Sequence, residues 1–293
     1  MCDNVLYKVL IIMNHGCNKI SFAIKNTNWC NLRCAHCCEN SGPNVVPNIM
    51  PLKYVEKYIA EFNAMPLPKW EHMVFTGGEA MAPYFHKQME YIPQCLDIAS
   101  SYGMVPFVKT NGVWGMNDEL RHLILRDFAN VAYKNDKMMS MDISVDAFHN
   151  NNNAVVRILN DVVRSDYLAP AVRISLVGLN DTKSRVVFMH LLNELRASGL
   201  DVDIGDGGSL ALWVPYVRGV SVCYDLGANI NKIGRAAENN LGQIVPDGRP
   251  HISDGHCLEI DNKHNAILNY KYTAPVNGRP VFDVVKELMS KVR

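Results

Sequence analysis

The sequence has no excess charge of either sign, no long uninterrupted hydrophobic run and no internal repeat. Lys+Arg and Asp+Glu each number 29 among the 293 residues, so we expect no basic surface for nucleic acid and no polybasic run for an anionic membrane. The apolar stretch from Val5 to Met13 is interrupted by Lys8 and is too short to cross a bilayer. It also lacks a basic n-region and a small-residue cleavage site, so we interpret it as a buried strand rather than a signal peptide. These absences predict a cytoplasmic protein without nucleic-acid or membrane partners.

Cysteine usage points away from a secreted disulfide framework, because the count of nine is odd and the chain is long. Four of the cysteines crowd into one short segment: Cys30, Cys34, Cys37 and Cys38. Such crowding is typical of a metal site. We therefore expect an oxygen-sensitive protein of a reducing compartment.

The distribution of apolar residues predicts an α/β fold. Short apolar runs of β type alternate with amphipathic helical patterns, as in βα units on a parallel sheet. One predicted helix carries an apolar face of Leu120, Leu123, Ile124 and Phe128. A second, with an apolar face of Phe188, Leu191, Leu192 and Leu195, is expected to be capped at its start by Asp181 or Thr182 and to stop at Gly199. Six units of this kind form a partial barrel, in which function collects at the carboxyl ends of the strands. The predicted strands are Ile20–Ile24, His72–Phe75, Met104–Lys109, Met139–Val145, Ala171–Val177 and Ala211–Val217.

The segment from Cys30 to Cys37 has the spacing C-x3-C-x2-C. Three thiolates in one loop can hold three irons of a [4Fe–4S] cluster, whose full ligation takes four protein ligands. The fourth iron is then open to a small molecule, as an open position makes a metal site reactive. The alternative is a structural zinc site with His36 as its fourth ligand, but zinc ligands usually come as two separated pairs.

This loop resembles the defining motif of the radical S-adenosylmethionine (radical SAM) enzymes. The resemblance implies an α/β fold with a partial (β/α)6 TIM-type barrel over residues 18–218 and a small C-terminal α+β cap over residues 219–293. It implies a [4Fe–4S] cluster on Cys30, Cys34 and Cys37, with S-adenosylmethionine (SAM) bound at the open iron. An electron from a reductant such as flavodoxin or ferredoxin then cleaves SAM to a 5′-deoxyadenosyl radical.

The second predicted strand runs into Gly77, Gly78 and Glu79. Two glycines allow the backbone to turn tightly and to approach a ligand, and a carboxylate accepts from an ammonium group. In the family that this chain resembles, such a Gly-Gly-Glu segment binds the amino group of SAM. A turn without any ligand is the alternative explanation.

The resemblance also implies SAM contacts at the ends of later strands, from Asn111, Ser144 and Asp146, with Arg173 as a weaker candidate for the SAM carboxylate. Asn111 and Asp146 could instead cap the helices that follow them. Arg173 could equally belong to a structural ion pair. His36 is expected to stack beside the adenine and not to bind iron.

The C-terminal part resembles the SPASM or twitch extension of some family members, with its cysteines nearly all missing. The stretch from Cys257 to Tyr272 alternates like a hairpin that turns near His264, and a helix is expected from about Pro280 to Lys291. We therefore expect one cluster and a degenerate cap.

Several longer strings resemble those of enzymes that modify ribosomally made peptides, especially peptidyl epimerases. A precursor peptide is therefore the expected substrate, and a separate protein is expected to recognise its leader because Cys30 leaves no room upstream for a recognition domain. The strings are Cys37-Cys38-Glu39-Asn40-Ser41-Gly42-Pro43, Phe75-Thr76-Gly77-Gly78-Glu79, Asn111-Gly112-Val113-Trp114-Gly115 and Ile143-Ser144-Val145-Asp146-Ala147-Phe148-His149.

One departure leaves the reaction outcome open. The epimerases quench their Cα radical with a cysteine after the C-terminal hairpin, where this chain has Lys271-Tyr272-Thr273-Ala274. Cys223 or Cys257 could supply the hydrogen atom instead. Without a donor, the peptide radical could proceed to cross-linking, carbon–carbon cleavage or excision. Two other classes also stay open: a radical SAM enzyme acting on a sugar or nucleoside, and a zinc-bound interaction protein that is not an enzyme.

Overall fold

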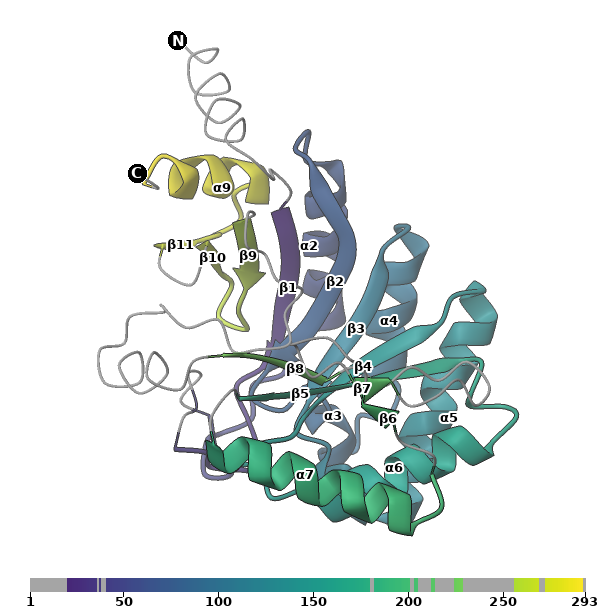
Figure 1. Cartoon of the computed structure of the whole chain (residues 1–293). Coiled ribbons are helices and arrows are strands. Elements are labelled where there is room, and N and C mark those ends of the chain that lie inside the picture. Colours follow the sequence, from purple (N-terminus) through teal and green to yellow (C-terminus); the bar gives the residue numbers. More distant parts are fainter. Residues whose placement is uncertain are drawn as a thin grey trace.

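The computed structural model describes residues 20–35, 37, 41–179, 182–200, 203–204, 212–213, 224–228, 256–268 and 272–291. The expected strand at Val5 to Met13 lies outside these residues. One sheet of nine strands runs through the molecule in the order β11-β10-β9-β1-β2-β3-β4-β5-β8 (Figure 1). Its strands are β1 (Ile20–Thr27), β2 (Lys69–Gly77), β3 (Val105–Thr110), β4 (Met139–Ser144), β5 (Val172–Leu179), β8 (Tyr224–Ala228), β9 (His256–Ile260), β10 (Asn265–Leu268) and β11 (Tyr272–Pro275).

Helices connect the parallel strands and cover one face of the sheet. They are α2 (Leu52–Ala64), α3 (Ala82–Phe85), α4 (Tyr91–Ser101), the 3-10 helix η1 (Val113–Met116), α5 (Asp118–Asn135), α6 (Asn152–Arg164), α7 (Thr182–Ala197) and, after the hairpin, α9 (Val281–Met289).

The pairing within the sheet confirms the predicted α/β class of partial-barrel type. Strands β1 to β5 pair in sequence and in parallel, and β8 continues the parallel order beyond β5. At the other edge β9 pairs in parallel with β1, and β10 and β11 follow as antiparallel strands. The fold is therefore a parallel sheet of alternating β/α units with antiparallel strands added at its C-terminal edge.

The sixth strand was predicted wrongly. Of the predicted range 211–217, the structure describes only Leu212–Trp213, which form β7 and pair antiparallel with β6 (Asp203–Ile204) in a separate sheet. The strand next to β5 is β8, formed by a later segment.

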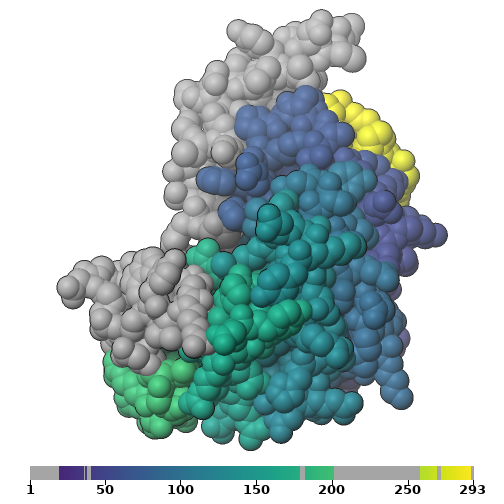
Figure 2. Space-filling view, turned by 90° about the vertical axis from the view of Figure 1, so that its right-hand side faces the viewer, coloured from purple at the N-terminus to yellow at the C-terminus, as the bar shows by residue number. Residues whose placement is uncertain are grey.

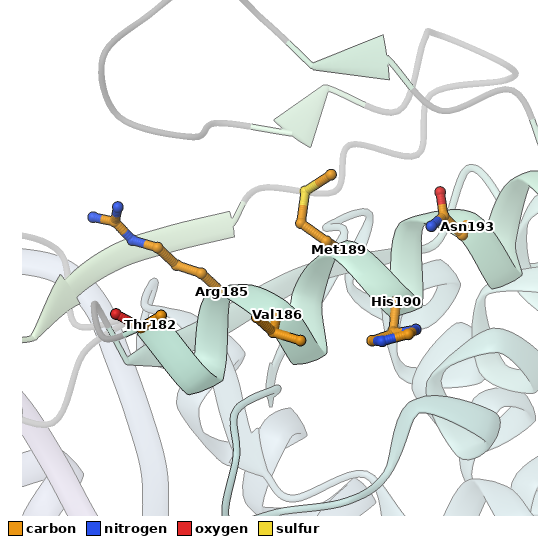
Figure 3. A pocket seen from close by; sticks show the side chains of 6 residues that line it. All are labelled: Thr182, Arg185, Val186, Met189, His190 and Asn193. Carbon is orange, nitrogen blue, oxygen red and sulfur yellow. The ribbon is translucent and has the colours of Figure 1, made fainter.

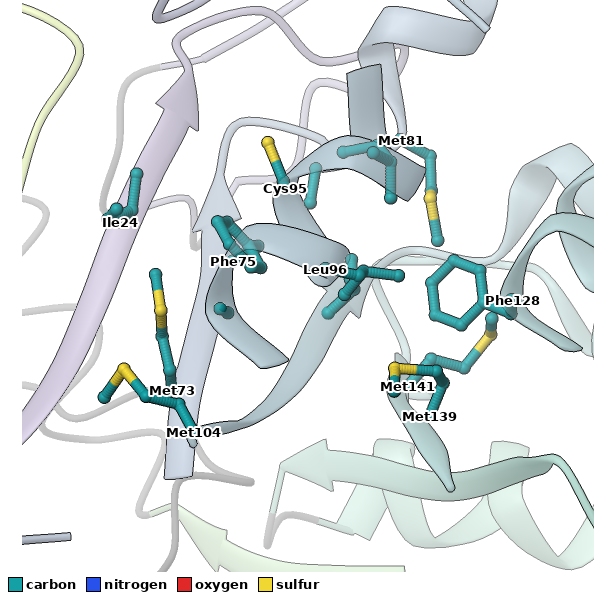
Figure 4. Close-up of a cluster of buried hydrophobic side chains, with 14 of the residues drawn as sticks. Ile24, Met73, Phe75, Met81, Cys95, Leu96, Met104, Phe128, Met139 and Met141 are labelled. Carbon is teal, nitrogen blue, oxygen red and sulfur yellow. The ribbon is translucent and has the colours of Figure 1, made fainter. Parts of the chain in front are cut away.

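The apolar core lies between the sheet and its helices. Alternate residues of each strand face the helices, as the period of two requires; Phe22 of β1, for instance, stacks on Phe62 of α2 with ring centroids 4.4 Å apart. The predicted apolar face of α5 is buried at Ile124 and Phe128, and Phe128 packs toward Met141 and its neighbours in Figure 4.

The predicted C-terminal hairpin and helix form, and they are joined to the parallel sheet. β9 lies beside β1 in a register that runs from the pair Ile20 and His256 to the pair Ile24 and Ile260. The first backbone N–H of α9, at Val281, donates to a carboxylate oxygen of α2 over 2.7 Å. The yellow residues of α9 accordingly lie beside the blue-violet residues of the first β/α unit in Figure 2.

No helix in the described part of the chain has both the length and the apolar character needed to cross a membrane.

Candidate functional site

The cysteine loop follows β1 at the carboxyl edge of the parallel sheet. Cys30 is buried, whereas Cys34 and Cys37 are half-buried. The Leu32 N–H donates to the Cys30 Sγ over 3.4 Å, and the Asn111 side-chain amide donates to the same sulfur over 3.6 Å. Burial, followed by the nearby Glu79 carboxylate, raises the pKa of the Cys30 thiol to about 12. Bound metal reverses this preference, because coordination deprotonates a thiol outright.

The two glycines after β2 allow a close approach of two backbones. Gly78 N–H donates to the Thr27 carbonyl over 2.9 Å, and the next N–H, that of Glu79, donates to the Trp29 carbonyl over 2.7 Å. A β-carbon at Gly77 would lie 2.2 Å from the Thr27 oxygen, and one at Gly78 would lie 2.1 Å from the Trp29 oxygen. The close approach that needs glycine is thus to the segment that leads into Cys30.

Glu79 is a buried carboxylate, 1% exposed, that organises the next strand end. Its Oε1 accepts from the Thr110 hydroxyl over 2.6 Å and from the Met81 N–H over 2.9 Å. Its Oε2 accepts from the Asn111 N–H over 2.8 Å. Burial raises the pKa of Glu79, although these hydrogen bonds oppose the rise. Its side chain holds the end of β3 against the turn after β2.

Asn111 joins the end of β3 to the cysteine loop. Its side-chain Nδ2 donates to Asn31 Oδ1 over 2.7 Å, beside the contact with Cys30. Its Oδ1 accepts from the Val113 N–H over 3.0 Å at the start of η1. The contact with Val113 is the capping role that the sequence left open, whereas the contacts with Asn31 and Cys30 were not predicted and the contact with SAM stays a prediction.

The end of β4 meets the same loop. Cys34 Sγ lies 3.7 Å from the Phe148 carbonyl oxygen, and Asp146 Oδ1 accepts from the Phe148 N–H over 2.8 Å. His149 Nδ1 lies 2.8 Å from the same Asp146 oxygen. Burial lowers the pKa of His149, but its contacts with Asp146 and Cys34 outweigh burial and raise the pKa to about 10. Nearby, the carbonyl of Ser144 accepts from the side-chain amide of Asn151, the residue before α6, over 2.7 Å.

A polar layer crosses the face of the sheet that is turned away from the core. Lys25 pairs with Thr76 in register, Lys109 with Asp142, and Asp142 with Ser175. These positions lie one to four residues before the carboxyl ends of their strands. Two residues earlier in β1, β2 and β3, a separate cluster of buried apolar side chains, called the apolar floor below, is formed by Ala23, Val74 and Phe107.

An ion pair connects this layer to the C-terminal strand. Lys25 Nζ lies 3.0 Å from Glu259 Oε2, with the lysine side chain 12% exposed and the glutamate fully buried. Charged groups are rarely buried unless they are paired, and buried ion pairs are weak sources of stability.

The structure does not bring every predicted residue to this site. Arg173 is the second residue of β5 and is exposed at the amino end of the strand, opposite the cysteine loop. His36 and Cys223 lie outside the described residues. The backbone of Cys257 pairs with that of Ser21, but its side chain also lies outside the described residues.

The donor set fits an iron–sulfur cluster by its chemistry. It supplies three thiols on one loop, with N–H donors aimed at the Cys30 sulfur, and hydrogen bonds to cluster sulfurs are a usual feature of such sites. Within the described part of the chain, no three His, Cys, Asp or Glu side chains are gathered as for a single metal ion.

Sequence reasoning missed the residues that support the site: Asn31, Thr110, His149 and the Lys25–Glu259 pair. The charged residues could have been found, because Lys25, Lys109 and Asp142 carry charge in or beside otherwise apolar strands, and charged residues are rarely buried without a partner. The hydrogen bonds of Thr110 had no such signal, since threonine is common in strands.

A hollow of about 260 Å³ lies elsewhere, on α7. Figure 3 shows its lining side chains projecting from that one helix. It contains none of the predicted site residues, and the lining residues are Thr182, Arg185, Val186, Met189, His190 and Asn193.

No family model matches the chain, and no curated protein matches it. Among solved structures, anSMEcpe with bound AdoMet is 16% identical over 59% of this chain and 48% of that chain, with a TM-score of 0.39. The same protein with AdoMet and a Cp18Cys peptide is 18% identical over the same shares, with a TM-score of 0.35. Methylornithine synthase (PylB) is 9% identical over 66% of this chain and 56% of that chain, with a TM-score of 0.39. The matched part thus spans about half the length of these solved chains. Because identities and TM-scores are low, the function proposed below is argued from the residues of this chain.

Proposed function

We propose that this protein is a radical SAM enzyme that acts on a ribosomally made precursor peptide. The observation that carries the proposal is the connection of the C-x3-C-x2-C loop to the ends of three neighbouring strands, through Trp29, Cys30 and Cys34. Functional groups of β/α barrels collect at this edge. When bound, a [4Fe–4S] cluster and SAM supply a 5′-deoxyadenosyl radical that removes a hydrogen atom from the substrate.

The protein's own residues bind and orient these groups. Cys30, Cys34 and Cys37 would hold the cluster, and Asn111 tunes the Cys30 sulfur by donating to it. Gly77 and Gly78 allow the loop to lie close to the sheet, and the Gly-Gly-Glu segment of Gly77, Gly78 and Glu79 is the proposed contact for the amino group of SAM. Ser144 and Asp146 at the end of β4 remain the proposed contacts for the rest of SAM, with His36 as the proposed neighbour of adenine.

The polar layer is the proposed site for the polar groups of the substrate. Lys25, Lys109 and Asp142 carry charges of both signs, and the apolar floor below them excludes water from one side. We propose that a separate protein delivers the precursor peptide, that a flavodoxin or ferredoxin supplies the electron, and that Cys223 or Cys257 is the hydrogen donor if the product is an epimer.

One observation favours a second candidate, a radical SAM enzyme that acts on a small charged metabolite. The Glu259 carboxylate is fully buried within the fold, and a buried charge pair suits a compact zwitterion better than the neutral backbone of a long peptide.

The test begins with anaerobic reconstitution of the protein with iron and sulfide. The expected result is a brown protein that binds about four irons and releases 5′-deoxyadenosine from SAM and dithionite. Alanine variants of Cys30, Cys34 and Cys37 should lose the iron, whereas the matched control Cys95→Ala, at a buried thiol outside the loop, should keep it. A colourless protein that holds one zinc and never loads iron would contradict the proposal. Precursor peptides and small zwitterions added in turn would then separate the two substrate classes.

A further inference from the structure

The segment that carries the cysteines is a loop whose two ends are joined by a short set of contacts between residues 26–28 and 48–50, called the neck below. Thr27 and Ile49 form an antiparallel bridge where the loop leaves and rejoins the body of the protein. Next to this bridge, the Met50 N–H donates to the Asn26 carbonyl over 2.8 Å. One step farther out, the Asn48 N–H donates to Asn28 Oδ1 over 2.8 Å. All three candidate cluster ligands lie within the loop that this neck closes.

The C-terminal hairpin contacts this neck directly. Asn262 lies in the turn between β9 and β10 and is 9% exposed. Its side-chain Nδ2 donates to the Asn48 carbonyl over 2.9 Å, and the Asn48 side chain donates back to the Asn262 carbonyl over 3.3 Å. These two hydrogen bonds join segments that are 214 residues apart in the chain and meet at Asn48, next to the bridge that closes the loop.

The turn that presents Asn262 is itself held in place. Asp261 Oδ1 accepts from the backbone N–H groups of Lys263 and Asn265 over 2.9 Å and 2.8 Å. His264 adopts a left-handed backbone conformation, with φ of 62°, and its Nδ1 lies 2.8 Å from the hydroxyl of Tyr58. The His264 ring packs on Tyr54, which lies on α2 together with Tyr58, and the two ring centroids are 4.3 Å apart. The turn is therefore anchored on α2, and Asn262 meets Asn48 from a fixed position.

We propose that Asn262 is a positioning residue for the cysteine loop, so that the C-terminal hairpin sets the geometry of the cluster site from outside it. This inference deepens the proposed function and rests on it for the role of the cluster. Asn262 does not touch a candidate ligand; it acts through Asn48 and Asn28, which close the neck. The Asn262 side chain donates to the Asn48 carbonyl, while the Asn262 backbone carbonyl accepts from the Asn48 side chain, and no aliphatic side chain at position 262 could provide the first of these donors.

The first experiment is hydrogen–deuterium exchange on the iron-free protein, comparing the wild type with Asn262→Ala. Losing a hydrogen bond of ordinary net strength should speed exchange in the loop between residues 28 and 48 by about fivefold. Asn262→Asp should behave in the same way, because a carboxylate cannot donate to the Asn48 carbonyl. Asn48→Ala should have a smaller effect, because it removes only the longer of the two hydrogen bonds.

The matched control is Asn160→Ala. Asn160 also bridges two elements through its side chain, with Nδ2 donating over 3.1 Å to Ser198 Oγ, but it lies on α6 and far from the loop in sequence. Its removal should speed exchange only around α6 and α7. Exchange in the loop of Asn262→Ala that matches the wild type, or that rises equally over the whole chain, would overturn the positioning role.

The second measurement is the rate at which a chelator removes iron from the reconstituted protein. Asn262→Ala should lose iron about fivefold faster than the wild type at an unchanged melting temperature, whereas Asn160→Ala should not. Equal rates of iron loss for the wild type and Asn262→Ala would count against the inference. If the wild type loads no iron at all while the loop exchange still responds to Asn262→Ala, the proposed function fails and the mechanical coupling of the hairpin to the loop stands.

Discussion

The most direct test of the site's construction is Gly78→Ala. A β-carbon at this position would lie 2.1 Å from the Trp29 carbonyl oxygen and 2.5 Å from its carbon. Ordinary contacts between carbon and oxygen are about 3.3 Å, so the turn after β2 and the segment before Cys30 must move apart by about 1 Å. Both are backbone, and neither can swing aside as a flexible side chain would.

This movement would lower the free energy of unfolding by breaking two hydrogen bonds and by overpacking a tight contact. The hydrogen bonds from Gly78 to Thr27 and from Glu79 to Trp29 contribute about 1 kcal/mol each. Overpacking of a tight contact adds about 1–3 kcal/mol. The free energy of unfolding should therefore fall by about 3–5 kcal/mol, as measured by denaturant unfolding of the iron-free protein under reducing conditions. After reconstitution, the variant should also bind less iron than the wild type.

Gly42→Ala is the matched control. Gly42 lies in the cysteine loop, and a β-carbon there would meet nothing closer than the Leu32 carbonyl oxygen at 3.9 Å. Neither Gly42 nor Gly78 has a positive φ, and both substitutions restrict the unfolded chain equally. Gly42→Ala should stay within about 0.5 kcal/mol of the wild type. Equal unfolding free energies for the two variants would refute the argument that the close approach after β2 holds the loop.

Four further substitutions test other parts of the site. The Thr110 hydroxyl donates to Glu79 and accepts from the Trp114 indole N–H over 2.9 Å, so Thr110→Val should lower the free energy of unfolding by about 2–4 kcal/mol by removing this shared partner. Thr110→Ser should restore most of the loss, and failure of the serine variant would argue for packing instead. Lys25→Met should lower the free energy of unfolding by about 3–5 kcal/mol, because it removes the ion-pair partner of the buried Glu259 carboxylate. Adding Glu259→Leu should recover most of this loss, and a double variant no more stable than Lys25→Met would exclude the lost ion pair as the cause. Burial, followed by nearby charge, raises the pKa of Tyr58 to about 12. The neutral phenol therefore stabilises the fold fully below its ordinary pKa of about 10, and this contribution is lost as the pH rises through 12. Tyr58→Phe should show a flatter decline in the free energy of unfolding above about pH 10, and parallel curves for the two proteins would contradict the assignment. Arg173→Ala should leave SAM affinity unchanged in calorimetry, since the side chain is exposed at the wrong end of β5; a tenfold loss would return Arg173 to the site.

The strands that the sequence predicted correctly share one property. β1 to β5 each carry a compact run of apolar residues bounded by turn residues, and a buried parallel strand needs little more. The range 211–217 was equally apolar but contains Pro215, and the strand beside β5 is β8 instead. Hydrophobicity alone therefore did not distinguish a central strand from a short segment of another sheet.

The candidate site was predictable where it depends on local sequence and unpredictable where it depends on pairing. The cysteine spacing and the polar residues after β2, β3 and β4 are visible in the chain itself. The reason that position 78 requires glycine is not visible in the sequence, because the contact of Gly78 with Trp29 exists only once β1 and β2 pair in their observed register. The Lys25–Glu259 ion pair likewise requires β9 to lie beside β1, and no local pattern indicates a contact so distant in sequence.

The pairing of β9 with β1 has a consequence for how the chain is made. During synthesis from the N-terminus, β1 can pair with β2 early, but its other side stays without a partner until residue 260 has been made. For most of translation the first strand therefore presents an open edge of apolar β sequence, which is a site for misassembly with other chains. Contacts between such distant segments also slow folding. A chaperone that shields this edge until the C-terminal hairpin arrives would raise the yield of folded protein, and a ribosome that stalls before the hairpin would leave the edge exposed.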